Sequence, residues 1–565
     1  MTNRIIECVP NFSEGRDKHV IGQITAAIEA SGGVKLLDVD PGEATNRTVV
    51  TFVGDPEAVV EAAFAGVKRA AELIDMRRHK GAHPRMGATD VLPLIPIAGV
   101  TLEECAALAR RLAERIAAEL RIPTYCYEAA AFTPERKNLA VCRAGEYEAL
   151  PEKLAHKESA PDFGARPFDE GVARTGATTV GARDFLIAVN FNLNTTSTRR
   201  ANAIAFDVRE KGRPVREGGS PVGKVVKDAA GNPLMQPGTL KATKAIGWFI
   251  EEYGIAQVSM NITDLAVTPL HVAFDEVCRK ADVRGVRVTG TEIVGLVPKR
   301  ALVEAGKYFL KKQCRSTGIA EEEIVRIAVK SMGLDDLKPF NPAEKVIEYL
   351  LEAEVEQKRL IDMTCKAFAE ETASESPAPG GGSIAAYMGA LGAALGTMVA
   401  NLSSHKAGWD DRWEEFSDWA EKGQAVLTEL LHLVDEDTAA FNRIMAVFAM
   451  PKSTDEEKAA RSAALQEATL YATEVPLRTM KAASRVFEIV RAMAAEGNPN
   501  SVSDAGVGAL AARSAVLGAC LNVKINAAGL KDRAKADALV GEADALAAEA
   551  VRLEAEVLNI VESKI

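Results

Sequence analysis

The sequence has 565 residues, 47% of them hydrophobic and 26% charged, and a formal net charge of -11. A chain of this length exceeds what one hydrophobic core supports, so we expect two to four domains of an ordinary globular protein. The acidic balance, with no basic stripe interleaved with aromatic residues, argues against a nucleic-acid partner.

Short β-rich runs alternate with helical patterns over the first 130 residues. Strands are predicted for RIIECV, VKLLDVD, RTVVTFV and VLPLIPI, and helices for residues 18–31 and 56–73. The order strand, helix, strand, strand, helix, strand is typical of a ferredoxin-like sandwich, here extended by a helix after Thr101 and a strand around Tyr125. Residues 159–181, rich in Gly, Pro and small polar residues, predict a loop or interdomain crossing.

A second run of the same order begins at DFLIAVNFNL. A helix near residues 198–211, the strands AIGWFI and AQVSMNIT, a helix after Pro269 and the run VRVTG with EIVGLVP complete it. The fold class expected is therefore α+β, with tandem ferredoxin-like βαββαβ sandwiches. Residues 213–243 carry turn signals and several basic residues, which favours an exposed hairpin over the alternative of a basic flap above an acidic substrate.

The composition changes near KPFNP, where β-branched alternation gives way to Ala, Glu, Leu and Lys at helical spacing as far as Ile565. This pattern predicts an all-α helical bundle. We expect domains at residues 1–181, 182–334 and 343–565, with a linker at residues 335–342.

Cysteine usage and hydropathy indicate the compartment. The eight cysteines include no Cys-x-x-Cys pair, so neither a disulfide framework nor a zinc site is suggested, and a reducing cytoplasm fits best. No basic stretch followed by an apolar run opens the sequence, and no uninterrupted apolar stretch reaches about 18 residues, so export and membrane spanning are disfavoured.

The loop RRHKGAHPRMGATD, from Arg77 to Asp90, concentrates histidine and basic residues between a helix and a strand. Pro84 restricts His83 to extended backbone, and a histidine held in this way can transfer protons near neutral pH. Arg85 or Arg78 could bind a carboxylate. The alternative is a solvated surface histidine.

Two acids lie two apart on the predicted strand LLDVD, so Asp38 and Asp40 should share one face. Asp40, at the strand end, is the better candidate to orient a histidine or an amidinium substrate. An ordinary turn residue before Pro41 is the alternative.

The helical part holds a Gly-rich segment, SPAPGGGS, at a predicted helix start. Free N–H groups of Gly381, Gly382 and Ser383 could bind an anion there, although the glycines could equally serve close helix packing. Further along the chain, GNPNSVSD ends one helix and caps the next. Asn498, Ser503 and Asp504 should therefore lie at a bundle end where a ligand could meet them.

An aspartate interrupts the apolar stripe of a helix predicted from about Glu421 to Phe448. Apolar residues recur at helical spacing, and Asp437 occupies the gap; the stripe consists of Leu427, Leu430, Val434, Phe441, Ile444 and Phe448. A buried aspartate must be paired, protonated or functional, and desolvation raises its pKa. Asp435 and Glu436 fall off the stripe and are expected to be solvated. A structural hydrogen bond is the alternative for Asp437.

Long motifs in a fixed order resemble the formiminotransferase-cyclodeaminase family across nearly the whole chain. The first part carries ECVPNFSEG, TNRTVVTFVG, DMRRHKGAHPRMGATDVLP and VGARDFLIAVN, and the second carries PAPGGGS, LVDEDTAAF and GNPNSVSD. The resemblance implies a bifunctional, metal-free folate enzyme with N-formimino-L-glutamate and tetrahydrofolate, which can be polyglutamated, as substrates. It also implies a homo-oligomer built from dimers.

By this resemblance, His83 matches the catalytic histidine of the transferase and Asp437 the catalytic aspartate of the deaminase. The segment from Gly164 to Gly176 matches the folate-binding segment. We count as substrate-binding candidates the residues in and beside that segment, namely Gly164, Thr175, Gly176, Ala177 and Thr178. Relative to the mammalian pattern this chain inserts residues at 213–243.

Two alternatives of another class remain open. The helical part could be a non-catalytic assembly or folate-sensing module, as an Ala-rich bundle often is. The first part could bind folate without transferring the formimino group.

Overall fold

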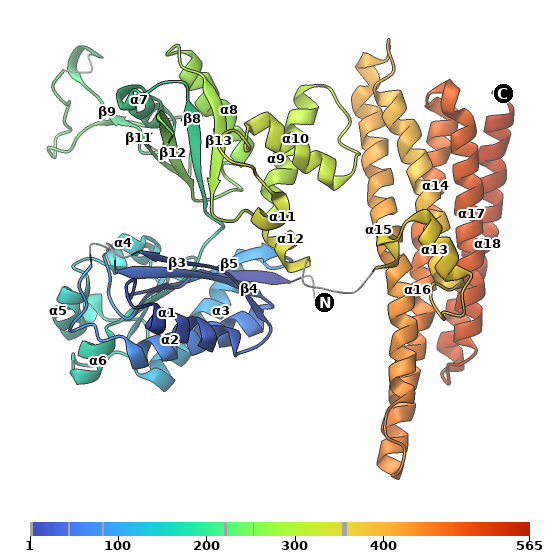
Figure 1. Ribbon diagram of the computed structural model, residues 1–565, viewed down its shortest axis with the longest axis horizontal. Coiled ribbons are helices and arrows are strands. Elements are labelled where there is room, and N and C mark those ends of the chain that lie inside the picture. Colours follow the sequence, from blue (N-terminus) through green and yellow to red (C-terminus); the bar gives the residue numbers. More distant parts are fainter. Residues whose placement is uncertain (1–3, 43–45, 82–83, 220–222, 252, 353–358) are drawn as a thin grey trace. The chain divides into compact units, whose positions relative to one another are not determined.

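The computed structural model describes residues 4–42, 46–81, 84–219, 223–251, 253–351 and 359–565, and the backbone of residue 352. Contacts within the chain define two compact units. One comprises Met1–Ala301 with Asp336–Leu351, and the other comprises Leu302–Asp335 with Glu352–Ile565. The first is built of α/β layers and the second of helices (Figure 1), which confirms the expected fold class.

The first sandwich has the expected βαββαβ order. Its α2 helix begins after Asp55, whose side chain caps the Glu57 N–H, and α3 begins with a capping box between Thr101 and Glu104. The elements are β1 (Ile5–Cys8), β2 (Asn11–Phe12), α1 (Lys18–Glu29), β3 (Val34–Gly42), β4 (Arg47–Gly54), α2 (Pro56–Leu73), β5 (Thr89–Ala98), α3 (Leu102–Arg115) and β6 (Thr124–Glu128).

The sheet contains a strand that the sequence interpretation missed. Residues 159–181, expected to be a loop, include the short helix α6 (Glu170–Thr175) and most of β7 (Thr178–Ala182). Strand β7 lies between β5 and β6 and pairs with both in parallel. All five of its residues are buried. The short run TTV was hidden by the Gly- and Pro-rich residues before it.

The second sandwich repeats the topology in four antiparallel strands, in the order β11-β12-β8-β13. Between α7 and β11 the chain makes a hairpin in which β9 pairs with β10, which confirms the expected excursion at residues 213–243. The elements are β8 (Ile187–Leu193), α7 (Thr198–Val208), β9 (Arg213–Pro214), β10 (Met235–Gln236), β11 (Thr243–Ile250), β12 (Ile255–Ile262), α8 (Leu270–Asp282) and β13 (Val288–Val294).

Side-chain alternation gives the seven-stranded sheet two different faces. On one face, Leu92 and Leu94 of β5 join the main core beneath α1, α2 and α3. On the other face, Val91 joins a smaller cluster with Tyr125 and Tyr127. This second face leaves room for a cavity.

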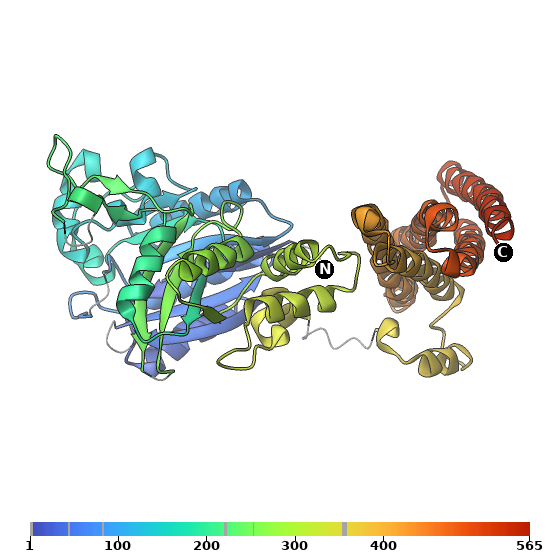
Figure 2. The same ribbon diagram turned by 90° about the horizontal axis from the view of Figure 1, so that it is seen from above.

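The bundle consists of long helices whose axes run nearly side by side (Figure 2). Its core is rich in alanine and glycine, which lets the helices approach closely; a Cβ on Gly423, for example, would lie 2.2 Å from Thr397 Oγ1. The helices are α14 (Gly381–Ser404), α15 (Trp413–Phe448), α16 (Asp455–Glu496), α17 (Val502–Ala527) and α18 (Arg533–Glu562).

The remaining α-helices lie between the strands and helices named above or before the bundle in the sequence. They are α4 (Leu139–Cys142), α5 (Leu150–Ala155), α9 (Lys299–Lys312), α10 (Glu321–Met332), α11 (Pro342–Lys345), α12 (Ile347–Glu352) and α13 (Cys365–Thr372). The compact units place α10 with the bundle, and α11 with the α/β layers. The limits expected from the sequence, 182–334 and 343–565, divide the chain differently and remain a prediction.

Two segments, Gly381–Ser404 and Pro499–Ala527, are long and apolar enough to cross a membrane by length and composition. Both belong to the bundle, and 61% and 50% of their most apolar windows are buried inside it. Core helices of a bundle pass the same test.

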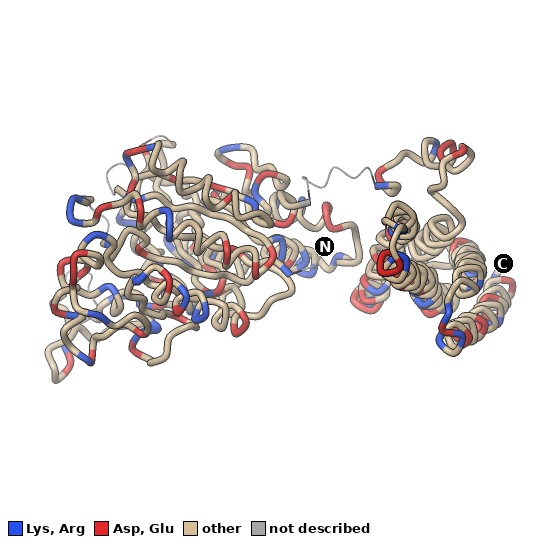
Figure 3. The backbone as a smooth tube through the Cα atoms, turned by 90° about the horizontal axis from the view of Figure 1, so that it is seen from below, with Lys and Arg blue, Asp and Glu red and all other residues tan. Residues whose placement is uncertain are grey.

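Lys and Arg are interspersed with Asp and Glu over both units (Figure 3).

Candidate active sites

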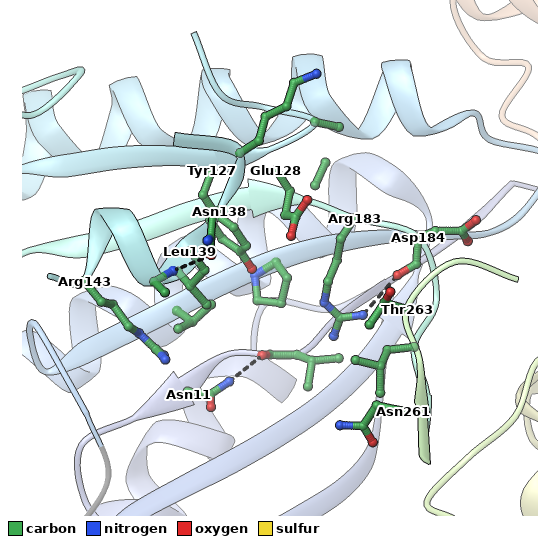
Figure 4. A pocket seen from close by; sticks show the side chains of 18 of the residues that line it. Asn11, Tyr127, Glu128, Asn138, Leu139, Arg143, Arg183, Asp184, Asn261 and Thr263 are labelled. Atoms are coloured by element: carbon green, nitrogen blue, oxygen red, sulfur yellow. Dashed lines mark hydrogen bonds between the residues drawn. The ribbon is translucent and has the colours of Figure 1, made fainter. Parts of the chain in front are cut away.

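A cavity of about 1220 Å³ opens on the second face of the seven-stranded sheet. Asn11, Pro93 and Tyr127 of the first sandwich contribute to its wall, and Lys244 and Asn261 contribute from the second sandwich. Figure 4 shows the polar side chains that converge on it. Its walls thus come from both halves of the first unit, and the interface between two domains is where ligand sites preferentially occur.

The loop from Arg77 to Asp90 reaches this cavity. His83 lies outside the described residues, but the adjacent Pro84 is part of the cavity wall. Just beyond it, the Met86 N–H donates to Asp90 Oδ1 at 2.9 Å, and the Ala88 N–H donates to the Thr175 carbonyl at 2.8 Å. The carboxyl-terminal end of the loop is therefore fixed at the wall.

The other histidine of the loop, His79, is held in one tautomer by its hydrogen bonds. His79 Nε2 lies 2.9 Å from the Asn46 carbonyl, and its Nδ1 accepts from Arg85 Nε at 3.3 Å. The proton must therefore be on Nε2 in the neutral ring. Burial lowers the pKa of His79, and the nearby Arg85 charge lowers it further. His79 thus holds the loop together as a neutral group.

The candidates in and beside the expected folate segment do not line the cavity. Thr175 and Gly176 instead support the loop from Arg77 to Asp90. Gly176, at φ +68°, packs against Met86, and a Cβ there would lie 2.2 Å from the Met86 carbonyl oxygen. Ala177 and Thr178 are buried, whereas Gly164 packs on Ala117. Their role in binding folate remains a prediction.

Arg85 is already engaged by carboxylates. Glu148 accepts two of its hydrogen bonds, at 2.8 and 2.7 Å, and Glu146 accepts a third at 3.2 Å. These bonds raise the Arg85 pKa. Asp40 is exposed on β3 close to Arg47. Neither predicted residue lines the cavity, and their contact with substrate remains a prediction.

Two buried carboxyl groups lie beneath the cavity, and sequence reasoning gave neither of them a role. Asp90 forms an ion pair with Arg143, and burial raises the Asp90 pKa to about 6 against the effect of that arginine. Burial also raises the Glu7 pKa to about 7, opposed by Arg183. The available signal for Glu7 was that one acid interrupts the apolar residues of β1, because strand alternation alone places it on the face opposite Ile6 and Cys8, where exposure would be expected.

Replacing Glu7 with Gln is expected to stabilise the first unit at alkaline pH. Because the pKa of Glu7 is about 7 in the folded chain against an ordinary 4.5, the unfolded chain loses this proton first as pH rises. Glu7 therefore destabilises the fold progressively between pH 4.5 and about 7. Glu7→Gln should raise the unfolding free energy by about 3 kcal/mol at about pH 8, and by much less at about pH 5. Denaturant unfolding at both pH values tests this, and an equal effect at both would contradict it.

The Gly-rich helix start and the stripe aspartate, identified separately in the sequence, meet in the structure. Helix α14 begins at Gly381, and its first turn faces Asp437 of α15. Ser383 Oγ donates to Asp437 Oδ2 at 3.1 Å, and the backbone of Ser383 also lowers the pKa of this carboxyl. Burial raises the pKa of Asp437, and the bonds from Ser383 oppose this rise. The result is a half-buried carboxyl suited to proton transfer.

Gly382 makes this approach possible. A Cβ at Gly382 would lie 2.1 Å from Asp437 Oδ1, so a side chain would displace the carboxylate. Gly382→Ala should therefore lower, by about 100-fold, the deaminase activity that the family resemblance implies for Asp437. Gly541→Ala, in α18, has no atom within 4 Å of the added Cβ and serves as the control with unchanged activity. Steady-state assays of both variants test this, and full activity of Gly382→Ala would contradict the geometry.

The apolar stripe of α15 is only partly buried. Leu430 and Val434 are buried, whereas Phe441 and Phe448 are 37% and 53% exposed. The stripe loses its cover beyond Asp437 because α14 begins there, at Gly381. Asp437 thus lies at the edge of the core.

The expectation that Asp435 and Glu436 are solvated was wrong. Asp435 Oδ1 accepts from the Leu360 N–H at 2.6 Å, and burial raises the pKa of Asp435. Glu436 forms an ion pair with Arg478 at 3.5 Å, and its carboxylate lies 3.6 Å from His432 Nε2. The physical reason for Asp435 is that residues before the bundle, around Leu360, cover it, whereas Glu436 is partnered by Arg478 of α16.

The residues expected at a bundle end lie at the opposite end of α14. The Asn498 N–H donates to Ser403 Oγ at 2.8 Å, in the last turn of α14, while Ser503 is exposed and Asp504 partly exposed. Gly381 and Ser403 are about 33 Å apart along the helix. Within one chain Asn498, Ser503 and Asp504 therefore do not join Asp437, and any ligand contact by them remains a prediction.

No group of three or more His, Cys, Asp or Glu arranged to hold a metal ion occurs in the part of the chain that the structure describes.

Comparison with known proteins matches three successive stretches of the chain. Family models match residues 5–183 (formiminotransferase domain, N-terminal subdomain), 188–352 (formiminotransferase domain) and 364–545 (formiminotransferase-cyclodeaminase). The formimidoyltransferase-cyclodeaminase of Rattus norvegicus is 43% identical over 94% of each chain. The Dictyostelium discoideum protein of the same name is 37% identical over 100% of this chain and 99% of its own. A glutamate formimidoyltransferase of Streptococcus pyogenes serotype M1 is 41% identical over 54% of this chain and 94% of its own.

Proposed function

The chain belongs to the formiminotransferase-cyclodeaminase family, and from this premise we propose which of its residues carry each reaction. It is a bifunctional enzyme of folate-dependent histidine degradation, with glutamate formimidoyltransferase and formimidoyltetrahydrofolate cyclodeaminase activities. The observation that carries the assignment of residues is the contact of Asp437 with the first turn of α14.

In the transfer step, N5 of tetrahydrofolate attacks the amidine carbon of N-formimino-L-glutamate and forms a tetrahedral intermediate. Collapse of this intermediate breaks the bond to the glutamate nitrogen, which needs a proton to leave. His83 removes the N5 proton and delivers it to that nitrogen, and Asp40 orients the imidazole or the amidinium. The position of Pro84 in the cavity wall supports this assignment.

In the second step, N10 attacks the same carbon of 5-formiminotetrahydrofolate in its amidinium form and closes the ring. The proton that N10 releases is the one that the departing nitrogen needs to leave as ammonia, and 5,10-methenyltetrahydrofolate remains. Asp437 carries this proton. Its raised pKa suits both halves of the transfer. The N–H groups at the start of α14 help to place the folate.

Each reaction can be tested independently in the full-length chain. Supplied with N-formimino-L-glutamate and tetrahydrofolate, it should release glutamate; supplied with 5-formiminotetrahydrofolate alone, it should release ammonia. Release of glutamate without ammonia from either mixture would instead support the alternative of a non-catalytic or folate-sensing bundle.

We also propose a homo-oligomer built from dimers, polyglutamated tetrahydrofolate as the natural co-substrate and a cytoplasmic location. Exposed apolar side chains on the bundle support association, and they include Leu391, Met398, Leu402, Leu521 and Ile525. The eight cysteines are free thiols, which suits a reducing compartment. Light scattering of the purified chain tests the oligomer, and a strictly monomeric mass would exclude it.

A further inference from the structure

Arg183 is a cation held inside the transferase cavity. It follows β7, and its backbone N–H donates to the Leu94 carbonyl at 3.2 Å, which fixes its position where the chain leaves the first sheet. Its side chain lines the cavity. Figure 4 shows the guanidinium pointing inward, on the side of Asn261 and Thr263.

Among the described residues Arg183 forms no ion pair. Its hydrogen bond is from Nη1 to the backbone carbonyl of Asp184, at 3.1 Å. The Asp184 carboxylate is turned to another partner, Arg300, at 2.8 Å. Arg143 differs, because its charge is met by the buried Asp90. The Arg183 guanidinium therefore keeps most of its N–H donors available for a ligand.

Arg183 and two lysines of the cavity wall share a single carboxyl group. Lys244, Arg183 and Lys137 all line the cavity and all act electrostatically on one carboxyl group, that of Glu128. The other acids of the wall have partners of their own: Glu146 binds Arg85, Glu210 accepts from the Ala242 N–H, and Asp264 accepts from the Ala266 and Val267 N–H groups. The positive charge of Arg183 also lowers the pKa of the buried Glu7. Burial nevertheless raises that pKa to about 7, so Glu7 is partly protonated near neutral pH. An anionic ligand would complete this cluster.

We propose that Arg183 binds a carboxylate of a glutamate moiety in the transferase cavity, with Lys244 of the second sandwich as the supporting cation. The guanidinium offers two parallel N–H donors that match a carboxylate. The glutamate moiety belongs either to the formimino donor or to tetrahydrofolate, since both substrates carry one. This assignment rests on the transfer reaction proposed above, and it replaces Arg85, whose donors are occupied, as the principal carboxylate-binding arginine.

The test pairs Arg183→Gln with substrates that lack one carboxylate. The γ-carboxylate is removed in N-formimino-L-glutamine, the α-carboxylate in N-formimino-L-isoglutamine, and the folate glutamate in tetrahydropteroate. Wild type should lose about 30-fold in kcat/KM with at least one of these analogues, and Arg183→Gln should lose about 30-fold with the intact substrates. With the analogue that lacks the bound carboxylate, Arg183→Gln should lose no more than about 3-fold further. The analogue that shows this behaviour identifies the source.

Equal losses by wild type and Arg183→Gln with all three analogues would overturn the proposal, as would an unchanged kcat/KM in the variant. Thermal unfolding followed by circular dichroism reports whether the first unit of the variant is intact. Arg183→Lys, which keeps the charge without the fork, should give a kcat/KM between those of wild type and Arg183→Gln. Arg111→Gln, on the exposed surface of α3, is the control with unchanged transfer. Absence of transfer by wild type would count against the proposed function and not against this site.

Discussion

Replacing Asp437 with Asn is expected to abolish ammonia release while formimino transfer continues at the wild-type rate. The amide has the shape of the carboxylate and can still accept the hydrogen bond from Ser383 Oγ, so the packing of α14 on α15 should survive. It cannot carry a proton between N10 and the departing nitrogen. We expect a loss of about 10³-fold in the rate of ring closure, measured as 5,10-methenyltetrahydrofolate and ammonia formed from 5-formiminotetrahydrofolate.

A neighbour on the same helix provides the matched control. Asp435 is also half-buried, and burial raises its pKa too, but its carboxylate binds the Leu360 N–H and not the start of α14. Asp435→Asn should therefore retain most of the activity. If both variants were equally impaired, damage to α15 would explain the loss better than proton transfer.

The second large effect concerns His83. His83→Ala should lower the rate of formimino transfer by about 10²- to 10⁴-fold, because the N5 proton then has no acceptor. Ammonia release from 5-formiminotetrahydrofolate should not change. Glutamate release measures the first activity, and supplying the intermediate directly isolates the second.

The other histidine of the same loop separates catalysis from loop integrity. His79 is held as a neutral ring between Asn46 and Arg85, so His79→Gln should cost less than about 10-fold in transfer. A defect as deep as that of His83→Ala would assign the effect to a disordered loop. Loss of both activities in His83→Ala would contradict two independent sites.

Local patterns predicted most of the elements because their periods are set by neighbouring residues. Helix α2 was expected at residues 56–73 and occupies Pro56–Leu73, with Asp55 as its cap. Asp437 was recognised for the same reason, as one polar residue in an apolar stripe. Strand β7 was missed because its partners, β5 and β6, lie far away in the sequence and its own run is only five residues long.

The composition of the sites was harder to predict than their existence. Arg85 was predicted to bind a carboxylate because it lies close to His83 in the sequence, whereas the hydrogen bonds that occupy it come from Glu148, some 60 residues away. The burial of Asp435 likewise depends on Leu360, which no helical period could reveal. Sequence spacing identifies groups on one element, and it does not show which of them a distant segment occupies.

The position of β7 also limits how the chain can be divided into working fragments. A fragment that ended near residue 160, where the composition suggests a loop, would lack the strand between β5 and β6 and would leave both with unpaired backbone edges. It would also lose Gly176, against which Met86 packs beside the cavity. We expect such a truncated polypeptide to aggregate on expression, whereas one that continues past Ala182 keeps all seven strands of the sheet.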